Sequence, residues 1–533
     1  MSGICGLVPA QERKTPGAKN TNIDGGTDTG DVNGELKQAE LRSKEGQDVS
    51  VNTTQFVSHL DPSSDLMMVG SNRSLKQRIG LWVSKAEEEC RYGGGGITSC
   101  RKAVPVPPTL DRFLLSHLNA MHAFEFPSDD KKKELLSIYF DYVDPILPIV
   151  DKNAFLSAYT RGQYSVPLLH AILMTAARHR RSLDILDHPR RFAVDCYRKI
   201  RGLLYAGIET NNLVLTRIYT LMSLHSEGPE AFKEGARNLA VAFHYGVGLG
   251  IHLRFSDATD HPTEEGSPVD NGSHRTSSLN LFWSMWCLDL CAACANGIPL
   301  KIHPRDMGVS LESAEDGPQG TLFKGLVRAC QTLDAIIDLY RPNSQFNEVP
   351  EIVKTTSFPD DGTSFTALFR LIHYTSILLS YKRVSSMKDE DVSENLLSVS
   401  LDVYDLVEKY NDLVPLPIIP YAVSLTFAIF LRFFNRESVR TAWKRGCDIL
   451  DYMANFWWAA EALSSMARSV FEKLEAELKQ QEPETVDFDK YQVAENLPDG
   501  TLSSFMGQTS IFNELDPDVV DYWFPDTGYN IFD

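Results

Sequence analysis

Residues 135–155 read LLSIYFDYVDPILPIVDKNAF and join a helical pattern to two closely spaced prolines. Apolar residues recur there at the spacing of one helix face, at Leu135, Ile138, Tyr139 and Tyr142. Ser128 is the expected N-cap, and the two aspartates that follow it suit the helix dipole. Pro145 disfavours helical geometry at the residue before it, so the helix is predicted to end at Asp144.

The same helical period extends through most of the chain between residues 105 and 480. It recurs on faces that contain Ala236, Leu239, Ala240, Phe243 and Val247; Leu281, Met285, Leu288, Ala292 and Ala295; Leu322, Leu326, Cys330, Leu333, Ile337 and Tyr340; and Leu396, Val399, Val403, Leu406 and Tyr410. No convincing run of alternating strand residues is present. The sequence therefore predicts an all-α domain of a dozen or more helices over residues 105–480.

The ends of the chain have a different composition. Residues 1–104 are rich in Gly, Ser, Thr, Asn and Asp, and thirteen acids balance thirteen basic residues there. Such a segment buries too little apolar surface to offset its ordering entropy, so we predict a disordered arm. Residues 481–533 contain twelve acids and one lysine, a charge of -11 out of a total of -19. This balance argues against a chain that coats nucleic acid through bulk attraction.

The compartment and the relation to a membrane follow from three further observations. The first residues lack the apolar core of a secretory signal, and nine cysteines are an odd and sparse number that suits a reducing compartment. Leu413 to Leu431 is uncharged for nineteen residues, but three prolines crowd its first half. We expect a Pro-rich turn and then a buried helix over about 421–434, with no membrane span.

Motifs for catalysis and metal binding are weak. Cys287, Cys291 and Cys294 share one helix face, but no fourth ligand has a recognisable spacing, so small core residues are favoured over a metal site. The glycine run at 246–250 lacks a phosphate-loop spacing and is expected to end a helix. No nucleophile, zinc-protease or P-loop motif is found, so the sequence does not indicate an enzyme, and it predicts no cofactor and no metal.

The densest basic stretch allows two interpretations. It contains Arg178, Arg180, Arg181, Arg190 and Arg191. These residues are candidates for a nuclear-import signal. The alternative is a solvated helix end whose charges interact with the helix dipole.

Four segments in order resemble the fungal-specific transcription factor domain, the regulatory middle region of zinc-cluster regulators. They are the Leu135–Phe155 stretch, a small-residue helix at 168–177, the segment 236–253 that ends in Leu249-Gly250-Ile251-His252, and Phe282-Trp283-x2-Trp286-x2-Asp289 followed by Gly297-x-Pro299-Leu300-x-Ile302 and Arg305-Asp306. The stretch before Pro148 is most similar to the cutinase and carbon-utilisation branch. The resemblance implies a helical regulatory domain, a nuclear location and control of a metabolic or secondary-metabolite gene set.

The chain departs from that family at its N-terminal end. The family pattern has six cysteines beginning with C-x2-C, whereas residues 1–130 contain only Cys5, Cys90 and Cys100. Six thiolates are needed to hold two tetrahedral zinc ions with bridging sulfurs. No residue can therefore be assigned as a zinc ligand or DNA contact, and direct DNA binding by this chain is in doubt. We expect either a shortened regulator or one that acts through a DNA-binding partner. The dimers expected are a homodimer or a heterodimer with a DNA-binding regulator.

The acidic C-terminal segment also contains nine aromatic residues. Aromatic and acidic residues mixed in this way are typical of amphipathic disordered activation segments, although an acidic solubilising tail is the alternative. The candidate anchors for a coactivator groove are Tyr522, Trp523, Phe524, Tyr529 and Phe532. The sequence thus predicts a transcription activator with an arm at 1–104, a regulatory domain at 105–480 and an activation tail at 481–533. The alternatives are a non-DNA-binding cofactor of a partner regulator and a helical biosynthetic enzyme.

Overall fold

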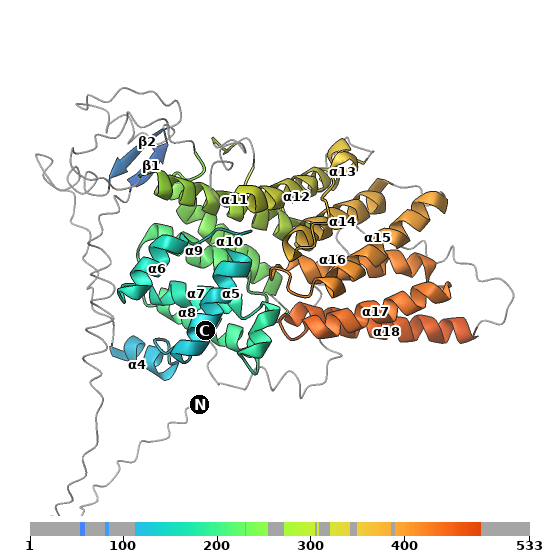
Figure 1. Ribbon diagram of the computed structural model, residues 1–533, viewed down its shortest axis with the longest axis horizontal. Coiled ribbons are helices and arrows are strands. Elements are labelled where there is room, and N and C mark those ends of the chain that lie inside the picture. The colour runs from blue at the N-terminus through green and yellow to red at the C-terminus, as the bar shows by residue number, and fades with distance from the viewer. Residues whose placement is uncertain are drawn as a thin grey trace, which may run out of the picture.

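The computed structural model of the chain describes residues 54–58, 80–84, 112–229, 231–253, 271–303, 306–308, 320–341, 349–384 and 390–480. Between 112 and 480 every described element is helical, which confirms the predicted all-α class (Figure 1). The division into three segments at 104 and 480 stays a prediction. The α-helices are α4 Arg112–Ala120, α5 Asp129–Ile138, α6 Lys152–Thr160, α7 Val166–Ala176, α8 Pro189–Tyr205, α9 Asn212–Met222, α10 Ala231–Gly248, α11 Asn271–Asn296, α12 Gly320–Leu339, α13 Glu351–Thr355, α14 Ser364–Val384, α15 Glu390–Lys409, α16 Ile418–Phe430, α17 Glu437–Met453 and α18 Trp458–Gln480.

Helix α5 ends as its sequence predicts. Ser128 occupies the N-cap position, although its side chain makes no capping hydrogen bond. The helix passes into a π-helical turn, Tyr139–Val143, and stops at Asp144, directly before the proline. After the Pro-x-x-Pro turn, Asp151 caps α6 by accepting a hydrogen bond from the Ala154 amide at 2.9 Å. Phe155 then anchors α6 in the core, with its ring centroid 5.7 Å from that of Phe140.

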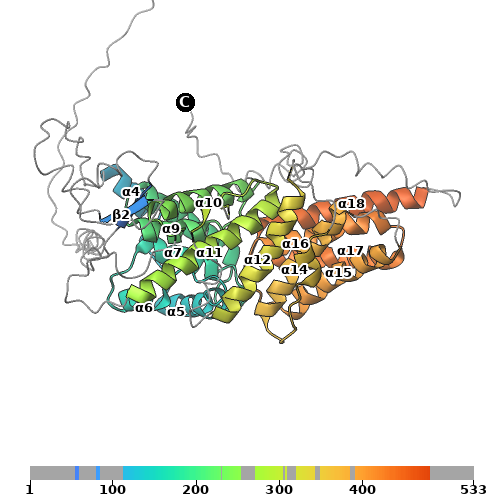
Figure 2. The ribbon, with the colours of Figure 1, turned by 90° about the horizontal axis from the view of Figure 1, so that it is seen from above.

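The helices form two groups joined by a pair of long helices. Helices α5–α10 make an N-terminal half, helices α14–α18 make a C-terminal half, and α11 and α12 run between them (Figure 2). Helix α11 packs on α10, α12 and α16, and α12 packs on α14. One continuous apolar core passes from α5 through α11 to α18. The two halves are therefore parts of one folded body.

The apolar segment near residue 420 lies inside this core. Helix α16 begins at Ile418, slightly earlier than predicted, because Pro420 fits within its first turn, where no intrahelical amide bond is lost. Of its thirteen residues, all but Ala428 are buried. Among the described helices, one segment, Ser277–Asn296 of α11, has the length and apolar character of a membrane span, and 72% of its most apolar window is buried inside the fold.

A small sheet corrects the expectation for the N-terminal arm. Strands β1 (Thr54–Ser58) and β2 (Gly80–Ser84) pair antiparallel, with Phe56 opposite Trp82. Strand β1 lies against α10, and the Phe56 ring meets His252 edge-on at a centroid distance of 6.0 Å. These ten residues are ordered as strands, contrary to the predicted disorder. Five-residue strands are too short to produce a clear period-two pattern, and the helical body supplies the surface that stabilises them. The rest of the arm lies outside the described residues.

Candidate regulatory site

The Gly-x-Pro loop after α11 is fastened by one buried carboxylate. Asp289 is completely buried and accepts hydrogen bonds from the backbone amides of Lys301 and Ile302 at 2.6 and 3.0 Å. The Lys301 ammonium group lies 2.9 Å from the other carboxylate oxygen. Gly297 follows the last residue of α11 with φ of 62°, a left-handed conformation that glycine adopts without strain. The number of residues between Asp289 and the loop is thus set by the hydrogen bonds that Asp289 accepts from residues 301 and 302.

A second polar cluster joins the two halves of the domain. The guanidinium group of Arg178, which follows α7, is completely buried. It donates hydrogen bonds to the Phe456 carbonyl oxygen at 2.7 Å and to His225 Nδ1 at 2.8 Å. Phe456 lies between α17 and α18, whereas His225 lies in the segment after α9. A single side chain therefore bonds to backbone of the C-terminal half and to a side chain of the N-terminal half.

Arg190 makes a similar set of contacts nearer the surface. Its guanidinium nitrogens lie 2.6 Å from Glu227 and 2.6 Å from Glu461, the latter on α18. It also donates to the Ala454 carbonyl oxygen at 3.3 Å. We call the set of Arg178, Arg190, His225, Glu227 and Glu461 the arginine clamp. Its members come from four places along the chain, and together they tie residues 223–227 to the α17–α18 turn and to α18.

The electrostatics of the clamp fix its protonation states. Burial lowers the pKa of Arg178 to about 10, against the opposing effect of Glu227, so the side chain stays charged near neutral pH. Burial, and then the charge of Arg178, lowers the pKa of His225 well below its usual value. A neutral His225 accepts from Arg178 through Nδ1, and its ring stacks on Tyr197 at a centroid distance of 4.1 Å. The cluster is thus a cation held by neutral and anionic acceptors.

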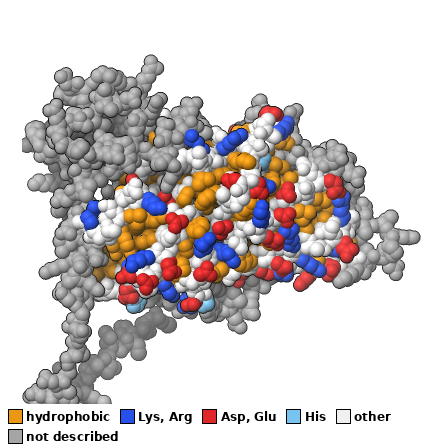
Figure 3. All heavy atoms as spheres, in the orientation of Figure 1, with side chains coloured by type: hydrophobic (Ala, Val, Ile, Leu, Met, Phe, Trp, Pro, Cys, Tyr) orange, Lys and Arg blue, Asp and Glu red, His pale blue; other side chains and the backbone are white. Residues whose placement is uncertain are grey.

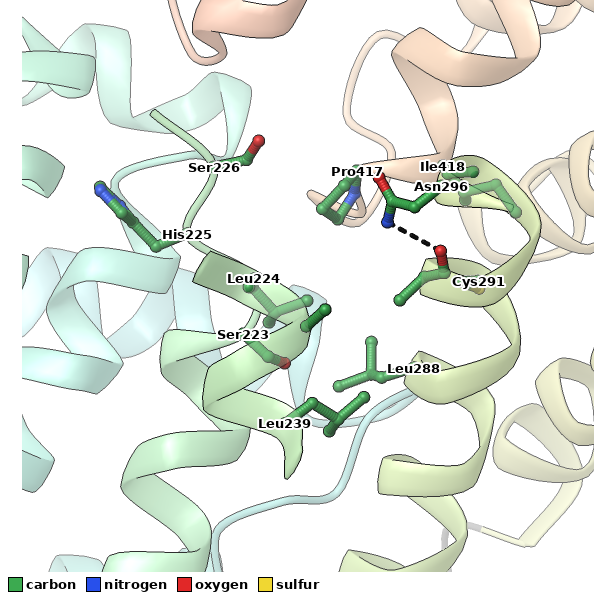
Figure 4. Close-up of a pocket in the computed structure, with 14 residues that line it drawn as sticks. Ser223, Leu224, His225, Ser226, Leu239, Leu288, Cys291, Asn296, Pro417 and Ile418 are labelled. Atoms are coloured by element: carbon green, nitrogen blue, oxygen red, sulfur yellow. Dashed lines mark hydrogen bonds between the residues drawn. The ribbon is translucent and has the colours of Figure 1, made fainter. Parts of the chain in front are cut away.

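A cavity of about 40 Å³ lies beside the clamp. Residues 223–226 form one wall, α10 and α11 form two others, and Pro417 and Ile418 at the start of α16 close one end (Figure 4). The close approach of α10 to the first wall needs a glycine, because a Cβ at Gly235 would lie 2.9 Å from the Ser223 carbonyl oxygen. Residues 223–227 thus face the cavity on one side and belong to the clamp on the other.

The cysteines of α11 belong to the core, as the sequence analysis favoured. Cys287 and Cys291 are buried, and Cys294 is half-buried. The Cys330 thiol of α12 donates a long hydrogen bond of 4.0 Å to the Cys287 carbonyl oxygen. A hydrogen bond with Cys330, followed by burial, raises the pKa of Cys291 well above its usual value. Within the described residues no group of three or more His, Cys, Asp or Glu side chains could hold a metal ion.

The structure separates the five arginines predicted as a nuclear-import signal. Arg178 is buried in the clamp, and Arg190 is mostly buried between two glutamates, so neither is accessible to a receptor in this fold. Arg180, Arg181 and Arg191 are exposed. Arg180 donates to the Tyr452 hydroxyl at 3.0 Å, and Arg181 stacks over the Tyr142 ring at 4.7 Å. A role of these three in import stays a prediction.

Two other predictions concern the activation anchors at the end of the chain and the charge of its surface. The five candidate activation anchors Tyr522, Trp523, Phe524, Tyr529 and Phe532 lie outside the described residues. On the face shown in Figure 3, acidic and basic side chains are interspersed, and they do not form a basic stripe of the kind that contacts phosphates. His225 and Glu227 were not predicted as site residues. The only local signal for them was a pair of ionisable residues directly after an apolar helix.

The Asp289 loop lies inside a segment that matches a known family model, the fungal specific transcription factor domain. Residues 136–328 form a fungal specific transcription factor domain. This domain contains α6–α11, most of α12, and the members of the clamp up to Glu227. It also contains all four segments on which the sequence resemblance was based, apart from the first residue of the first segment. The predicted family is therefore confirmed.

Curated relatives of this fungal transcription factor domain are regulators. The chain is 24% identical to cutinase transcription factor 1 alpha of Fusarium vanettenii over 39% of its length and 22% of that protein. It is 27% identical to the acetamidase regulatory protein of Aspergillus fumigatus over 36% of its length and 24% of that protein. A fusaric acid cluster transcription factor of Gibberella moniliformis is 34% identical over 13% of the chain and 11% of that protein.

These matches cover part of each protein. The chain spans about a quarter or less of the length of these relatives. No solved structure matches it. The names of the relatives agree with the prediction that the chain is a regulator and not an enzyme.

Proposed function

We propose that this chain is a transcription regulator of a metabolic or secondary-metabolite gene set, and that it acts in the nucleus. The observation that carries the proposal is the fungal specific transcription factor domain at 136–328, supported by relatives named as regulators of cutinase, acetamidase and fusaric acid genes. Arg180, Arg181 and Arg191 are the exposed basic residues through which an import receptor would act.

In this proposal residues 481–533 are the output element. Twelve acids and nine aromatics in 53 residues suit a segment that binds coactivator grooves as short induced helices. Acidic residues keep the aromatic side chains solvated until a groove accepts them. Helix α18 ends at Gln480, so this segment begins directly after the C-terminal half.

Fusion of residues 481–533 to a foreign DNA-binding domain is expected to activate a reporter severalfold above that domain alone. Replacement of Trp523 and Phe524 by alanine should remove most of this activity, because the two rings are the proposed anchors. Replacement of Phe505 and Phe512 by alanine is the matched control, since it also removes two aromatic rings but lies outside the proposed anchors. Equal activity of the unmodified segment and the Trp523/Phe524 variant would contradict the proposed role.

A second candidate function is that of a cofactor that binds a partner regulator. It is favoured by the cysteine pattern, because residues 1–130 of the printed sequence contain three cysteines and no C-x2-C pair. We expect the purified chain to give no sequence-specific shift of promoter DNA on its own, and to bind that DNA only together with a partner regulator from nuclear extract. A specific shift by the purified chain alone would reject the cofactor role.

A further inference from the structure

The cavity beside the arginine clamp has the chemistry of a small-molecule site. Fourteen residues line it, and among them there is no Lys, Arg, Asp or Glu. Leu224, Leu239 and Leu288 form an apolar floor, while Ser226 and Asn296 lie toward the opposite end with Pro417 (Figure 4). Binding pockets are usually of this kind, mainly apolar with a few polar groups that orient the ligand.

Ser226 adds a second, independent observation at this cavity. The residue is 3% exposed, and its buried hydroxyl has no hydrogen-bond partner among the described residues. A buried hydroxyl without a partner costs free energy, so native structures almost always satisfy it with protein, water or ligand. The Asn296 amide nitrogen is already bonded to the Ala292 carbonyl oxygen at 2.7 Å, which leaves its amide oxygen as an acceptor.

We propose that this cavity binds a short, neutral molecule with an alkyl end and a hydroxyl or carboxamide head. The cavity volume of about 40 Å³ compares with about 10–15 Å³ for the smallest space that holds one water. It therefore takes a terminal group of a few atoms, and the polar head meets Ser226 and Asn296. A carboxylate is excluded, because the lining offers no cation to offset its desolvation.

Occupation of the cavity is coupled to the C-terminal half. The ligand contacts Leu224 and Ser226. The neighbouring His225 bonds to Arg178, which donates to the Phe456 carbonyl oxygen. Glu227 pairs with Arg190, which bonds to the Ala454 carbonyl oxygen and to Glu461. A ligand that orders residues 223–227 therefore stabilises the contacts that hold α17 and α18. This step rests on the proposed function, since α18 leads into the proposed activation segment.

Binding is tested on the purified full chain with propionamide and 1-propanol at millimolar concentration, followed by ligand-observed NMR. Propionate is the charged analogue. We expect binding of the two neutral probes and none of propionate. Ser226→Ala should weaken propionamide binding by about tenfold, the loss typical of one neutral hydrogen bond. Ser284→Ala is the matched control, because Ser284 is also a buried, unpartnered hydroxyl on α11 but does not line the cavity.

Ala292→Leu fills the cavity and should abolish binding; if it unfolds the chain, Ala236→Val makes a smaller addition to the same cavity. Propionamide should also slow amide hydrogen exchange at 223–227 and 454–457. The site is rejected if neither neutral probe binds, which would mean that the cavity holds water only, or if the filled variants bind as the wild type does. Binding without slower exchange at 454–457 would reject the coupling. These measurements need no reporter, so their failure is distinct from a failure of the proposed function.

Discussion

Asp289→Ala is expected to lower the free energy of unfolding by about 3–5 kcal/mol, the cost of breaking a buried charge pair by removing one partner. The carboxylate is completely buried and holds two backbone amides and one ammonium group. Without it, the Lys301 charge and both amides lose their acceptor at the point where the chain leaves α11. Urea unfolding followed by circular dichroism measures the change.

Two further variants separate the anchoring role from a general effect of charge. Asp289→Asn keeps an oxygen acceptor, so it should cost less than the alanine variant. Asp338→Ala removes a half-exposed carboxylate that pairs with Arg341 at 2.7 Å, and it should change stability by no more than about 0.5 kcal/mol. A loss below about 1 kcal/mol for Asp289→Ala would show that the loop is held by its apolar contacts alone.

The features of this fold that the sequence predicts are those whose physical cause lies within a short stretch of the chain. Pro145 ends the helix before it at Asp144 wherever the rest of the chain lies. Gly250, two residues after α10, and Gly297, directly after α11, have positive φ. Long helical faces such as Leu322–Tyr340 repeat the apolar period several times. Each of these signals is contained within a few turns of chain, so one sequence is enough to read it.

The clamp could not be predicted because its contacts are distant in sequence. Arg178 bonds to the carbonyl oxygen of a residue 278 positions away, and an arginine among neighbouring basic residues has the same local pattern whether it is exposed or buried. The arginine stretch therefore suggested a solvated or receptor-binding surface, and the structure removes Arg178 and Arg190 from it. The strand at Thr54–Ser58 was missed for a related reason, since its stabilising surface is α10.

The contacts of Arg178 predict a large loss of stability when this residue is replaced. We expect Arg178→Leu to lower the free energy of unfolding by about 2–5 kcal/mol, the cost of leaving two buried acceptors without a donor. The substitution keeps part of the buried volume but leaves the Phe456 carbonyl oxygen and His225 Nδ1 without their donor. A guanidinium group supplies two well-oriented donors in a plane, which an ammonium group does not, so Arg178→Lys should recover only part of the loss. Urea unfolding measures both variants, and hydrogen exchange shows where the structure opens.

The segments in which amide hydrogen exchange rises show whether Arg178 joins the two halves or stabilises one half only. If Arg178 joins the halves, exchange in Arg178→Lys should rise at 223–227 and at 454–457 together, although these segments are more than two hundred residues apart. Arg198→Ala is the matched control, because Arg198 lies on α8 with its side chain 64% exposed and pairs with Asp195 at 2.8 Å; it should leave both segments unchanged. Faster exchange confined to residues near α7 would mean that Arg178 stabilises the N-terminal half only. Joint opening would identify the contact between residues 223–227 and the α17–α18 turn as the route by which the cavity and the C-terminal half are coupled.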